Sequence, residues 1–267
     1  MDELDRKMLM LLFRDGRISQ RRLAEELNVT PPTLNYRFRK LEEEGVLKGF
    51  TLFVNPNFLS LYYGFVAFTN YRDYDTPSIF LKFKCVEWLN VYGILGRSFR
   101  ELDEEVERMS RNLGEPKLKY VPEQSPESLK EMDLIVLRAL KDTPRASESE
   151  IAEVVGMPSK LVSKRLKVLS RRGVFSVFPV LDIPKSGLIM FSMFSRELKR
   201  IVPVLEPFTI FRITDGKAGI NVCLADNMGQ VRNLVNGARL NDPDSDVMII
   251  HEYTVSIQDK IDIRVES

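Results

Sequence analysis

Apolar residues near the start of the chain recur at helical spacing in three successive segments. Ser19 and Thr30 are suitable N-caps for the second and third segments, Pro31 suits a first helical position, and Gly45 ends the third segment. The run from Val46 to Val54 then predicts two short strands, which would form a wing. The inward-facing positions are Leu4, Met8, Leu11 and Leu12, then Leu23 and Leu27, then Leu34, Phe38 and Leu41.

The same plan returns in the second half of the chain, which indicates an internal duplication. The alignment places Leu4-Asp5 on Met132-Asp133, Arg17-Ile18-Ser19 on Arg145-Ala146-Ser147, Gly45-Val46-Leu47 on Gly173-Val174-Phe175, and Phe50 on Phe178. In this second copy Ser147 is the expected cap of the second helix. Residues 159–172 form the expected third helix, and residues 174–181 the expected wing.

Strand-like and helical runs follow each of these helical segments. In the second copy they give the order strand, helix, strand, strand, helix, strand. The first copy shows a less regular version, in which the second and third strands are crowded together. The predicted runs are residues 189–195, 198–205, 208–214, 219–224, 228–240 and 247–255 in the second copy, and 62–71, 78–84, 86–92, 102–113 and 117–121 in the first.

We therefore expect four segments and one linker. The linker is Pro122–Ser128, because it holds two prolines and polar residues and has no apolar anchor. The expected divisions are residues 1–57 (first winged helix-turn-helix), 58–121 (first αβ sandwich), 122–128 (linker), 129–186 (second winged helix-turn-helix) and 187–267 (second αβ sandwich with a C-terminal tail).

The outer face of the third helix in each copy is polar and largely basic. Two helices joined by a tight turn expose such a face to the major groove of DNA, where Arg and Lys neutralise phosphates and Asn, Ser and Arg bind base edges. The second copy is the expected stronger phosphate binder, because Glu42-Glu43-Glu44 ends the third helix of the first copy. The predicted DNA-binding residues are Thr33, Asn35, Tyr36, Arg37, Arg39 and Lys40, and then Lys160, Ser163, Lys164, Arg165, Lys167 and Arg171.

The balance of charge confines any nucleic-acid site to a local patch. Among 267 residues, 39 are Lys or Arg and 38 are Asp or Glu, so the formal net charge is +1. Hydrophobic residues make up 44%, which is enough for the cores of several domains. The abundance of Lys, Arg and Glu is compatible with a thermophilic source.

Cysteine and histidine are scarce, and this limits the chemistry available. Cys85 and Cys223 lie far apart in no metal-like spacing, which favours a reducing compartment. His251 is the only histidine, so we expect no metal site, no cofactor and no acid–base catalysis. The acidic start of the chain is not typical of a signal peptide, and no run approaches the ~18 apolar residues of a membrane span. A cytoplasmic protein with no membrane contact is expected.

Several of these motifs together resemble the N-terminal domain of the Lrp/AsnC (feast/famine) transcription regulators. The resemblance covers residues 3–55 closely and residues 132–182 more loosely. The residues that carry it are Leu4-Asp5-Arg6-Lys7, Asp15-Gly16-Arg17-Ile18-Ser19, Leu23-Ala24 and Arg37-Phe38-Arg39-Lys40-Leu41-Glu42-Glu43-Glu44-Gly45-Val46-Leu47.

The resemblance implies an α+β fold class with two winged helix-turn-helix domains, each followed by a βαββαβ (ferredoxin-like) sandwich domain, as a pseudo-dimer within one chain. It implies sequence-specific binding of double-stranded DNA in transcription regulation, and a further pairing of chains as a homodimer. It also implies a small-molecule effector at the loop between the second and third sandwich strands. In the second copy this loop holds Asp215, Gly216 and Lys217, although neither copy has the family's usual Gly-Asp-Tyr-Asp-like run.

Two other hypotheses stay open. Siroheme decarboxylases resemble the same family in both domains, and such an enzyme would place His251 and arginines such as Arg97, Arg100 or Arg212 beside an anionic tetrapyrrole. A transcription adaptor that does not bind DNA would instead use acidic surfaces such as residues 42–44 and 101–107. A DNA-binding regulator that is not an enzyme is the preferred hypothesis.

Overall fold

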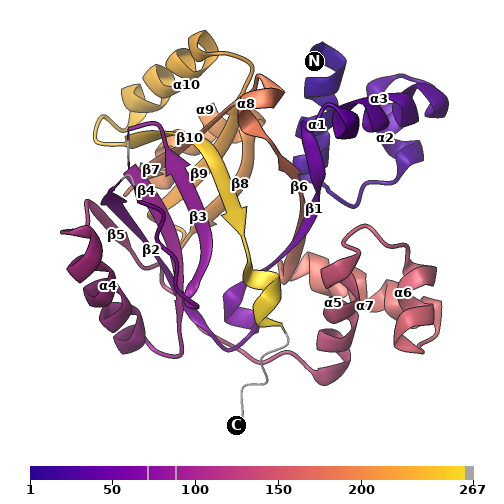
Figure 1. Ribbon diagram of the computed structural model, residues 1–267, viewed down its shortest axis with the longest axis horizontal. Coiled ribbons are helices and arrows are strands. Elements are labelled where there is room, and N and C mark those ends of the chain that lie inside the picture. The colour runs from indigo at the N-terminus through magenta and orange to yellow at the C-terminus, as the bar shows by residue number, and fades with distance from the viewer. Residues whose placement is uncertain (71, 88, 262–267) are drawn as a thin grey trace. The chain divides into compact units, whose positions relative to one another are not determined.

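The computed structural model describes residues 1–70, 72–87 and 89–261 (Figure 1). The chain forms two compact units, and each unit combines the corresponding segments of both copies. The helix-turn-helix unit comprises Lys7–Tyr62, Ser125–Leu181 and the residues from Val255 onward. The sheet unit comprises Met1–Arg6, Tyr63–Gln124 and Asp182–Thr254. Residues 262–267 of the expected C-terminal tail lie outside the described residues.

In the helix-turn-helix unit each copy supplies three helices and one strand. The predicted caps are confirmed: Ser19 accepts a hydrogen bond from the backbone N–H of Arg22, Thr30 accepts one from Thr33, and Ser147 forms a capping box with Glu150. The elements are α1 (Glu3–Arg14), α2 (Gln20–Leu27), α3 (Pro31–Glu43), β1 (Leu47–Val54) and the short turn η1 (Pro56–Phe58), then α5 (Glu131–Asp142), α6 (Glu148–Val155), α7 (Ser159–Arg171), β6 (Phe175–Leu181) and the short turn η3 (Ile257–Lys260).

Left-handed residues end the second and third helices of each copy. Gly45 and Gly173 follow the third helices with a φ of +67°, a conformation that glycine adopts without a steric penalty. Asn28 and Gly156 end the second helices in the same left-handed conformation, with φ values of 53° and 65°. The tight turns predicted from the sequence are therefore present in both copies.

The inner faces of the second and third helices are buried largely as predicted, but the faces of the first helices are rotated from our expectation. Leu9 and Leu137 are fully buried although the apolar pattern did not single them out, whereas Met132 is 37% exposed. Asp5 and Asp133 are buried at equivalent positions of the two copies. A buried carboxylate needs a partner, so these two residues call for a cation from a neighbouring helix.

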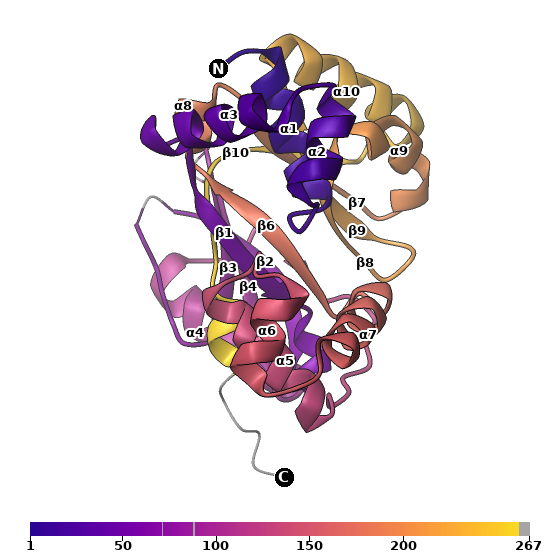
Figure 2. The same ribbon diagram turned by 90° about the vertical axis from the view of Figure 1, so that its right-hand side faces the viewer.

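The wing differs from the two short strands expected within each copy. Residues 47–54 form the single strand β1, which pairs antiparallel with β6 of the other copy; Figure 2 shows the two strands side by side. Gly49, with a φ of +137°, lies at an irregularity of the pairing and not at a hairpin turn. Phe50 lies opposite Pro179, and Thr51 opposite Phe178. Phe50 is equivalent to Phe178, and Thr51 is equivalent to Pro179. The pairing of β1 with β6 is therefore symmetric about its centre.

Equivalent arginines of the two copies also reach across to the turn of the other copy. Arg17 donates from Nη1 to the carbonyl oxygen of Pro144 (2.6 Å) and from Nη2 to that of Ala146 (2.7 Å). Arg145 donates from Nη2 to the carbonyl oxygen of Ile18 (3.1 Å). Because Ile18 and Ala146 are equivalent, the contact is reciprocal, as it is across the two-fold axis of a homodimer.

Both arginines are held in partly buried surroundings. Burial lowers the pKa of the Arg17 guanidinium, and burial together with repulsion from Arg17 lowers the pKa of Arg145. The Arg145 guanidinium lies over the rings of Phe50 (4.6 Å) and Phe38 (5.4 Å). Such contacts between a cation and an aromatic ring compensate part of the lost hydration.

The predicted linker contains no helix and no regular strand, and it is tied to the first copy. The backbone N–H of Glu127 donates to the carbonyl oxygen of Asn57 (2.7 Å), and Ser128 forms an isolated bridge with Leu59. Arg172 donates to the Glu127 carboxylate (2.8 Å). The connection is therefore fixed by specific bonds.

In the sheet unit, the described residues form one eight-stranded sheet in the order β5-β2-β4-β3-β10-β7-β9-β8. The four strands of each copy are adjacent and follow the same internal order, and the copies meet where β3 lies beside β10. The elements are β2 (Tyr62–Thr69), β3 (Ile79–Cys85), β4 (Leu89–Gly96), α4 (Phe99–Leu113), β5 (Leu118–Tyr120), α8 (Ile183–Ser186), β7 (Ile189–Ser195), α9 (Leu198–Leu205), η2 (Glu206–Phe208), β8 (Thr209–Thr214), β9 (Gly219–Ala225), α10 (Met228–Asn241) and β10 (Asp246–Val255).

The second copy has the expected βαββαβ order, and the first copy departs from it. Between β2 and β3 the described residues contain no helix, where the second copy has α9. This segment holds Asp73, Asp75 and Pro77 and lacks an apolar face, so it has nothing to pack on the sheet as a helix. Lys82 of β3 instead pairs with both aspartates, its Nζ lying 3.4 Å from each carboxylate.

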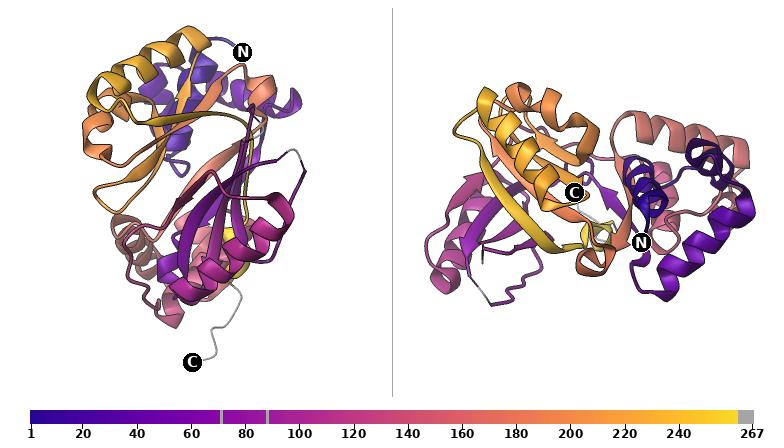
Figure 3. Two further views of the ribbon diagram at one scale, coloured as in Figure 1. Left: turned by 90° about the vertical axis from the view of Figure 1, so that its left-hand side faces the viewer. Right: turned by 90° about the horizontal axis from the view of Figure 1, so that it is seen from above.

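Helices cover one face of each half of the sheet (Figure 3). In the second copy α9 and α10 pack together over β7 and β9, where Phe191, Met193, Ile201, Cys223 and Ala238 form a buried core. In the first copy α4 packs on β4. None of the helices in the described part of the chain is long and apolar enough to cross a membrane.

We predict that Arg17→Met lowers the free energy of unfolding by about 1–3 kcal/mol, because it leaves two carbonyl oxygens without their donor. Arg21→Met is the matched control: the Arg21 side chain is 89% exposed and pairs with Glu25 one turn away, so a change within about 0.5 kcal/mol is expected. Urea unfolding measures both. Equal effects of the two substitutions would show that the contact between the copies does not stabilise the fold.

Candidate nucleic-acid interface

The outer face of α3 is accessible and carries most of the predicted residues. Thr33, Asn35, Tyr36 and Arg39 are exposed, and the Tyr36 ring is 61% exposed. Lys40 is half-buried. Leu34, Phe38 and Leu41 are buried on the opposite side of the helix, so packing on α2 and β1 fixes which face is presented.

The outer face of α7 is accessible in the same way and is more basic. Lys160, Lys164, Lys167 and Arg171 are exposed, and Ser163 is half-buried between them. Val162, Leu166 and Leu169 face inward. Val168, which the sequence pattern did not single out, is 42% exposed on this outer face.

The two outer helices differ in charge. Over 13 residues each, α3 holds three basic and two acidic residues, for a net charge of +1, whereas α7 holds five basic and no acidic residues, for +5. Lys40 also lies 3.9 Å from the Glu44 carboxylate, which weakens its field. That the second copy is the stronger phosphate binder stays a prediction.

Arg165 has a structural partner and stands apart from the other predicted DNA-binding residues. Its Nη1 lies 3.3 Å from the carboxylate of Asp133, whose side chain is only 7% exposed. In the first copy, Arg37 and Asp5 occupy the equivalent positions, and Asp5 is 1% exposed. The repeat itself holds the signal that sequence analysis missed, because it aligns an Asp with an Asp and an Arg with an Arg.

The predicted effector loop lies between β8 and β9 and forms a closed turn. The Asp215 carboxylate accepts hydrogen bonds from the backbone N–H of Lys217 (2.8 Å) and of Ala218 (2.9 Å), and Gly216 adopts a φ of +89°. Burial raises the pKa of Asp215, but these hydrogen bonds lower it by more, so the pKa lies below its ordinary value. One Asp215 oxygen therefore serves the loop itself, while the Lys217 side chain is exposed.

A tyrosine of the first copy contacts this loop. The Tyr120 hydroxyl donates to the carbonyl oxygen of Ala218 (2.9 Å), and its ring packs against Phe194, with the centroids 5.4 Å apart. Burial and the nearby Asp215 carboxylate raise the pKa of Tyr120. The loop is thus held both by its own hydrogen bonds and by Tyr120 of the first copy.

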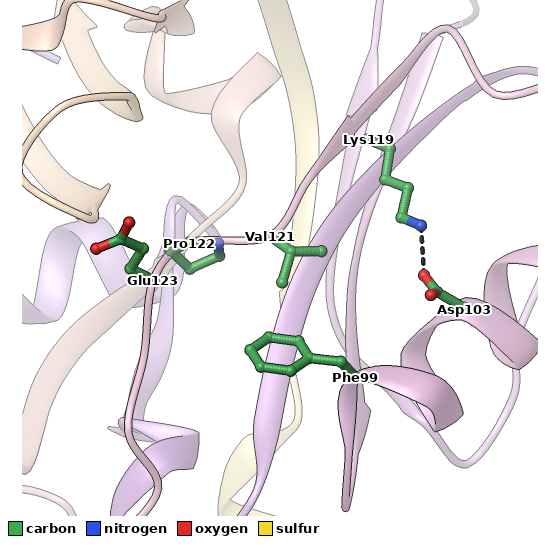
Figure 4. Close-up of a pocket in the computed structure, with 6 residues that line it drawn as sticks. All are labelled: Phe99, Asp103, Lys119, Val121, Pro122 and Glu123. Carbon is green, nitrogen blue, oxygen red and sulfur yellow. Dashed lines mark hydrogen bonds and ion pairs between the residues drawn. The ribbon is translucent and has the colours of Figure 1, made fainter.

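A pocket of about 380 Å³ lies between α4 and the segment that follows β5 (Figure 4). Lys119 and Asp103 point toward each other there and form an ion pair, so their charges neutralise one another. Phe99, Val121 and Pro122 complete the lining together with Glu123. The pocket has no set of converging polar groups of the kind that binds a small molecule.

The described residues contain no cluster of His, Cys, Asp and Glu side chains that would hold a metal ion. Cys85 and Cys223 are free and buried, and burial raises the pKa of each thiol to about 12. Neither thiol is therefore ionised near neutral pH, and neither is an activated nucleophile.

The comparisons with known proteins match the two helical segments. A family model described as winged helix-turn-helix DNA-binding matches residues 1–48 and again residues 129–175. The chain is 53% identical over 55 residues to an uncharacterized HTH-type transcriptional regulator of Pyrococcus abyssi, which is 21% of this chain and 37% of that protein. It is 37% identical over 59 residues to the leucine-responsive regulatory protein of Escherichia coli, 22% of this chain and 36% of that protein.

These matches have a limited reach. The chain spans little more than a third of the length of either relative. Among solved structures, the siroheme decarboxylase NirDL is similar over 95% of this chain and 93% of that one, with 13% identity and a TM-score of 0.49, a level that says nothing of activity.

The two matched segments coincide with the two sets of three helices, α1 to α3 and α5 to α7. The duplication inferred from the repeat is thereby confirmed. The chain thus carries a winged helix-turn-helix segment in each half, and the relatives that share this segment include the leucine-responsive regulatory protein, a helix-turn-helix regulator of the kind that the Lrp/AsnC resemblance predicts.

Proposed function

We propose that the chain is a transcription regulator that binds double-stranded DNA in a sequence-specific manner through α3 and α7. The observation that carries this proposal is the pair of exposed, polar third helices, each anchored by a buried apolar face and both held in one unit. A recognition helix needs such rigid support, because base contacts depend on sub-ångström placement of side chains.

The exposed residues divide into two chemical roles. Lys160, Lys164, Lys167 and Arg171 supply charge for phosphate oxygens, where each neutralised phosphate releases a counterion. Asn35, Arg39 and Ser163 offer the donors and acceptors that read base edges, Thr33 offers a hydroxyl for either target, and Tyr36 offers a ring for sugar or a thymine methyl group. Arg37 and Arg165 would act through the orientation of their helices.

We further propose that the chain, when bound to DNA at a promoter, blocks or recruits the transcription machinery. An effector would act at the loop of Asp215, Gly216 and Lys217, where the Lys217 ammonium is accessible to an anionic group. Because one Asp215 oxygen already accepts two backbone hydrogen bonds, an effector would contact the loop mainly through Lys217 and the Gly216 backbone. A second chain would add a second pair of recognition helices to the assembly.

We predict that Lys160→Ala, Lys164→Ala and Lys167→Ala together reduce the salt dependence of DNA binding. Fluorescence anisotropy of a duplex from upstream of the gene, titrated at several salt concentrations, gives the slope of log K against log salt. This slope is negative, and each lost phosphate contact makes it less negative by about 0.9, so the slope is expected to become shallower by about 2–3.

The matched control for this variant removes the same amount of charge elsewhere. Lys117, Lys185 and Lys199 are exposed in the sheet unit, and replacing all three with Ala is expected to leave the slope unchanged. If the wild-type chain binds neither this duplex nor a random one at ~50 mM salt, the DNA-binding function is rejected. A porphyrin-like absorption band of the purified protein would then separate the decarboxylase from the adaptor hypothesis.

We predict that Arg39→Ala weakens specific binding about tenfold or more while it changes binding to random duplex much less, because a bidentate contact to guanine discriminates between bases. Arg21→Ala, at an exposed arginine on α2 of the same copy, is the control for lost charge alone. Equal losses on specific and random duplex for Arg39→Ala would assign Arg39 to phosphate binding.

We predict that an anionic effector raises the melting temperature of the wild-type chain and not that of Lys217→Ala, since ligand binding stabilises the folded state by mass action. The probes are the twenty amino acids, each measured by thermal shift. Lys199→Ala, at another exposed lysine of the sheet unit, is expected to keep the response. A panel without any shift would reject the effector part of the proposal.

A further inference from the structure

We propose that a single chain binds a non-palindromic site in one fixed orientation, with α3 and α7 reading unlike half-sites. This inference rests on the proposed DNA-binding function and deepens it. It follows from a contrast within the helix-turn-helix unit: the scaffold that joins the two copies is symmetric, whereas the surfaces that the scaffold carries are not.

The symmetric part is the contact between the copies. Phe50 and Thr51 of β1 face Pro179 and Phe178 of β6, their equivalents in reverse order. Arg17 and Arg145 donate to the carbonyl oxygens of Ala146 and Ile18, which are also equivalent positions. An approximate two-fold axis therefore relates α3 to α7, in the way that a homodimer presents two identical recognition helices to a palindrome.

The outward positions of the two recognition helices do not share this symmetry. Only Arg37 and Arg165 are identical, and Arg165 is directed at the buried Asp133 of its own copy. Every other outward pair differs in charge, size or hydrogen-bonding capacity. These pairs are Pro32 and Lys160, Thr33 and Leu161, Asn35 and Ser163, Tyr36 and Lys164, Arg39 and Lys167, Lys40 and Val168, and Glu43 and Arg171.

The starts of the second helices differ as well. The first helix of a helix-turn-helix motif crosses the DNA backbone, so its N-terminal turn approaches phosphates. In the first copy this turn carries Arg21 and Arg22, whereas α6 carries Glu148 and Glu150. The first turn of α2 is therefore basic, although both arginines pair with a glutamate one turn away, whereas the first turn of α6 is acidic.

The two half-sites follow from this chemistry. Asn35, Tyr36 and Arg39 suit a half-site with adenine, a thymine methyl group and guanine in the major groove. Lys164 and Lys167 suit guanine or closely spaced phosphates, and the exposed Val168 suits a thymine methyl group. A palindrome would place one of the two helices on a half-site that does not match its side chains.

Site-directed DNA cleavage tests the orientation. Glu42 and Ser170 are exposed, equivalent, and outside the proposed contacts, so Glu42→Cys and Ser170→Cys can each carry an iron–EDTA reagent beside one recognition helix. The native Cys85 and Cys223 are buried and will not react. On a site selected from random duplex and labelled at one end, we expect each variant to cut only one half, and the two variants to cut opposite halves. Cleavage of both halves by each variant would overturn the inference.

A transplant of the recognition face gives an independent measurement. Asn35→Ser, Tyr36→Lys, Arg39→Lys and Lys40→Val together give α3 four of the seven outward residues in which it differs from α7. The wild-type chain is expected to bind either palindrome made from one half-site at least about tenfold more weakly than the selected site. The transplanted variant is expected to prefer the palindrome made from the α7 half-site. Comparable wild-type affinity for the palindromes would overturn the inference.

The two proposals fail in different ways. If the wild-type chain retains no duplex from the random pool, the DNA-binding function fails, and the inference fails with it. If the chain selects a duplex and the selected sites are palindromes, DNA binding stands and only the inference is overturned. An equal melting temperature of the transplanted variant and the wild-type chain checks that the four substitutions leave the fold intact.

Discussion

The pairing of β1 with β6 is the contact on which the arrangement of the two helix-turn-helix segments depends. It joins segments from opposite halves of the sequence, and the reciprocal hydrogen bonds of Arg17 and Arg145 add a second set of contacts between the same segments. These arginines donate to backbone carbonyl oxygens, so the contact constrains backbone positions and not only side chains. A single chain thereby acquires the geometry that a homodimer obtains by association, without the entropy cost of bringing two chains together.

Duplication within one chain also releases the two copies from identity. In a homodimer any substitution on the recognition helix appears twice, whereas here each copy can change alone. Arg17 and Arg145, which join the copies, are identical at equivalent positions, and so are Asp5 and Asp133 and Arg37 and Arg165. The exposed faces of α3 and α7 differ, and so do the two sandwich halves: among the described residues, only the second half has a helix between its first two strands.

The sequence predicted the local elements well because their signals are local. Caps, glycine stops and apolar periodicity placed α2, α3, α6 and α7 almost to the residue. The partners of the strands were not predictable in this way: nothing within residues 46–54 shows that β1 pairs with β6 and not with itself. For the same reason the sequence pattern, which places Arg165 beside the outer face of its helix, does not show that its guanidinium lies 3.3 Å from the buried Asp133. The other predicted residues of α3 and α7 lie on accessible faces, and their contacts with DNA remain predictions.

Hydroxyl-radical footprinting of one chain on its selected duplex tests the central claim most directly, since the claim is that one chain supplies two DNA-reading helices. The account predicts two protected segments whose centres lie about one helical turn, or 10–10.5 base pairs, apart, at a stoichiometry of one chain per duplex. A single protected segment at that stoichiometry, or two segments that appear only when a second chain binds, would contradict it.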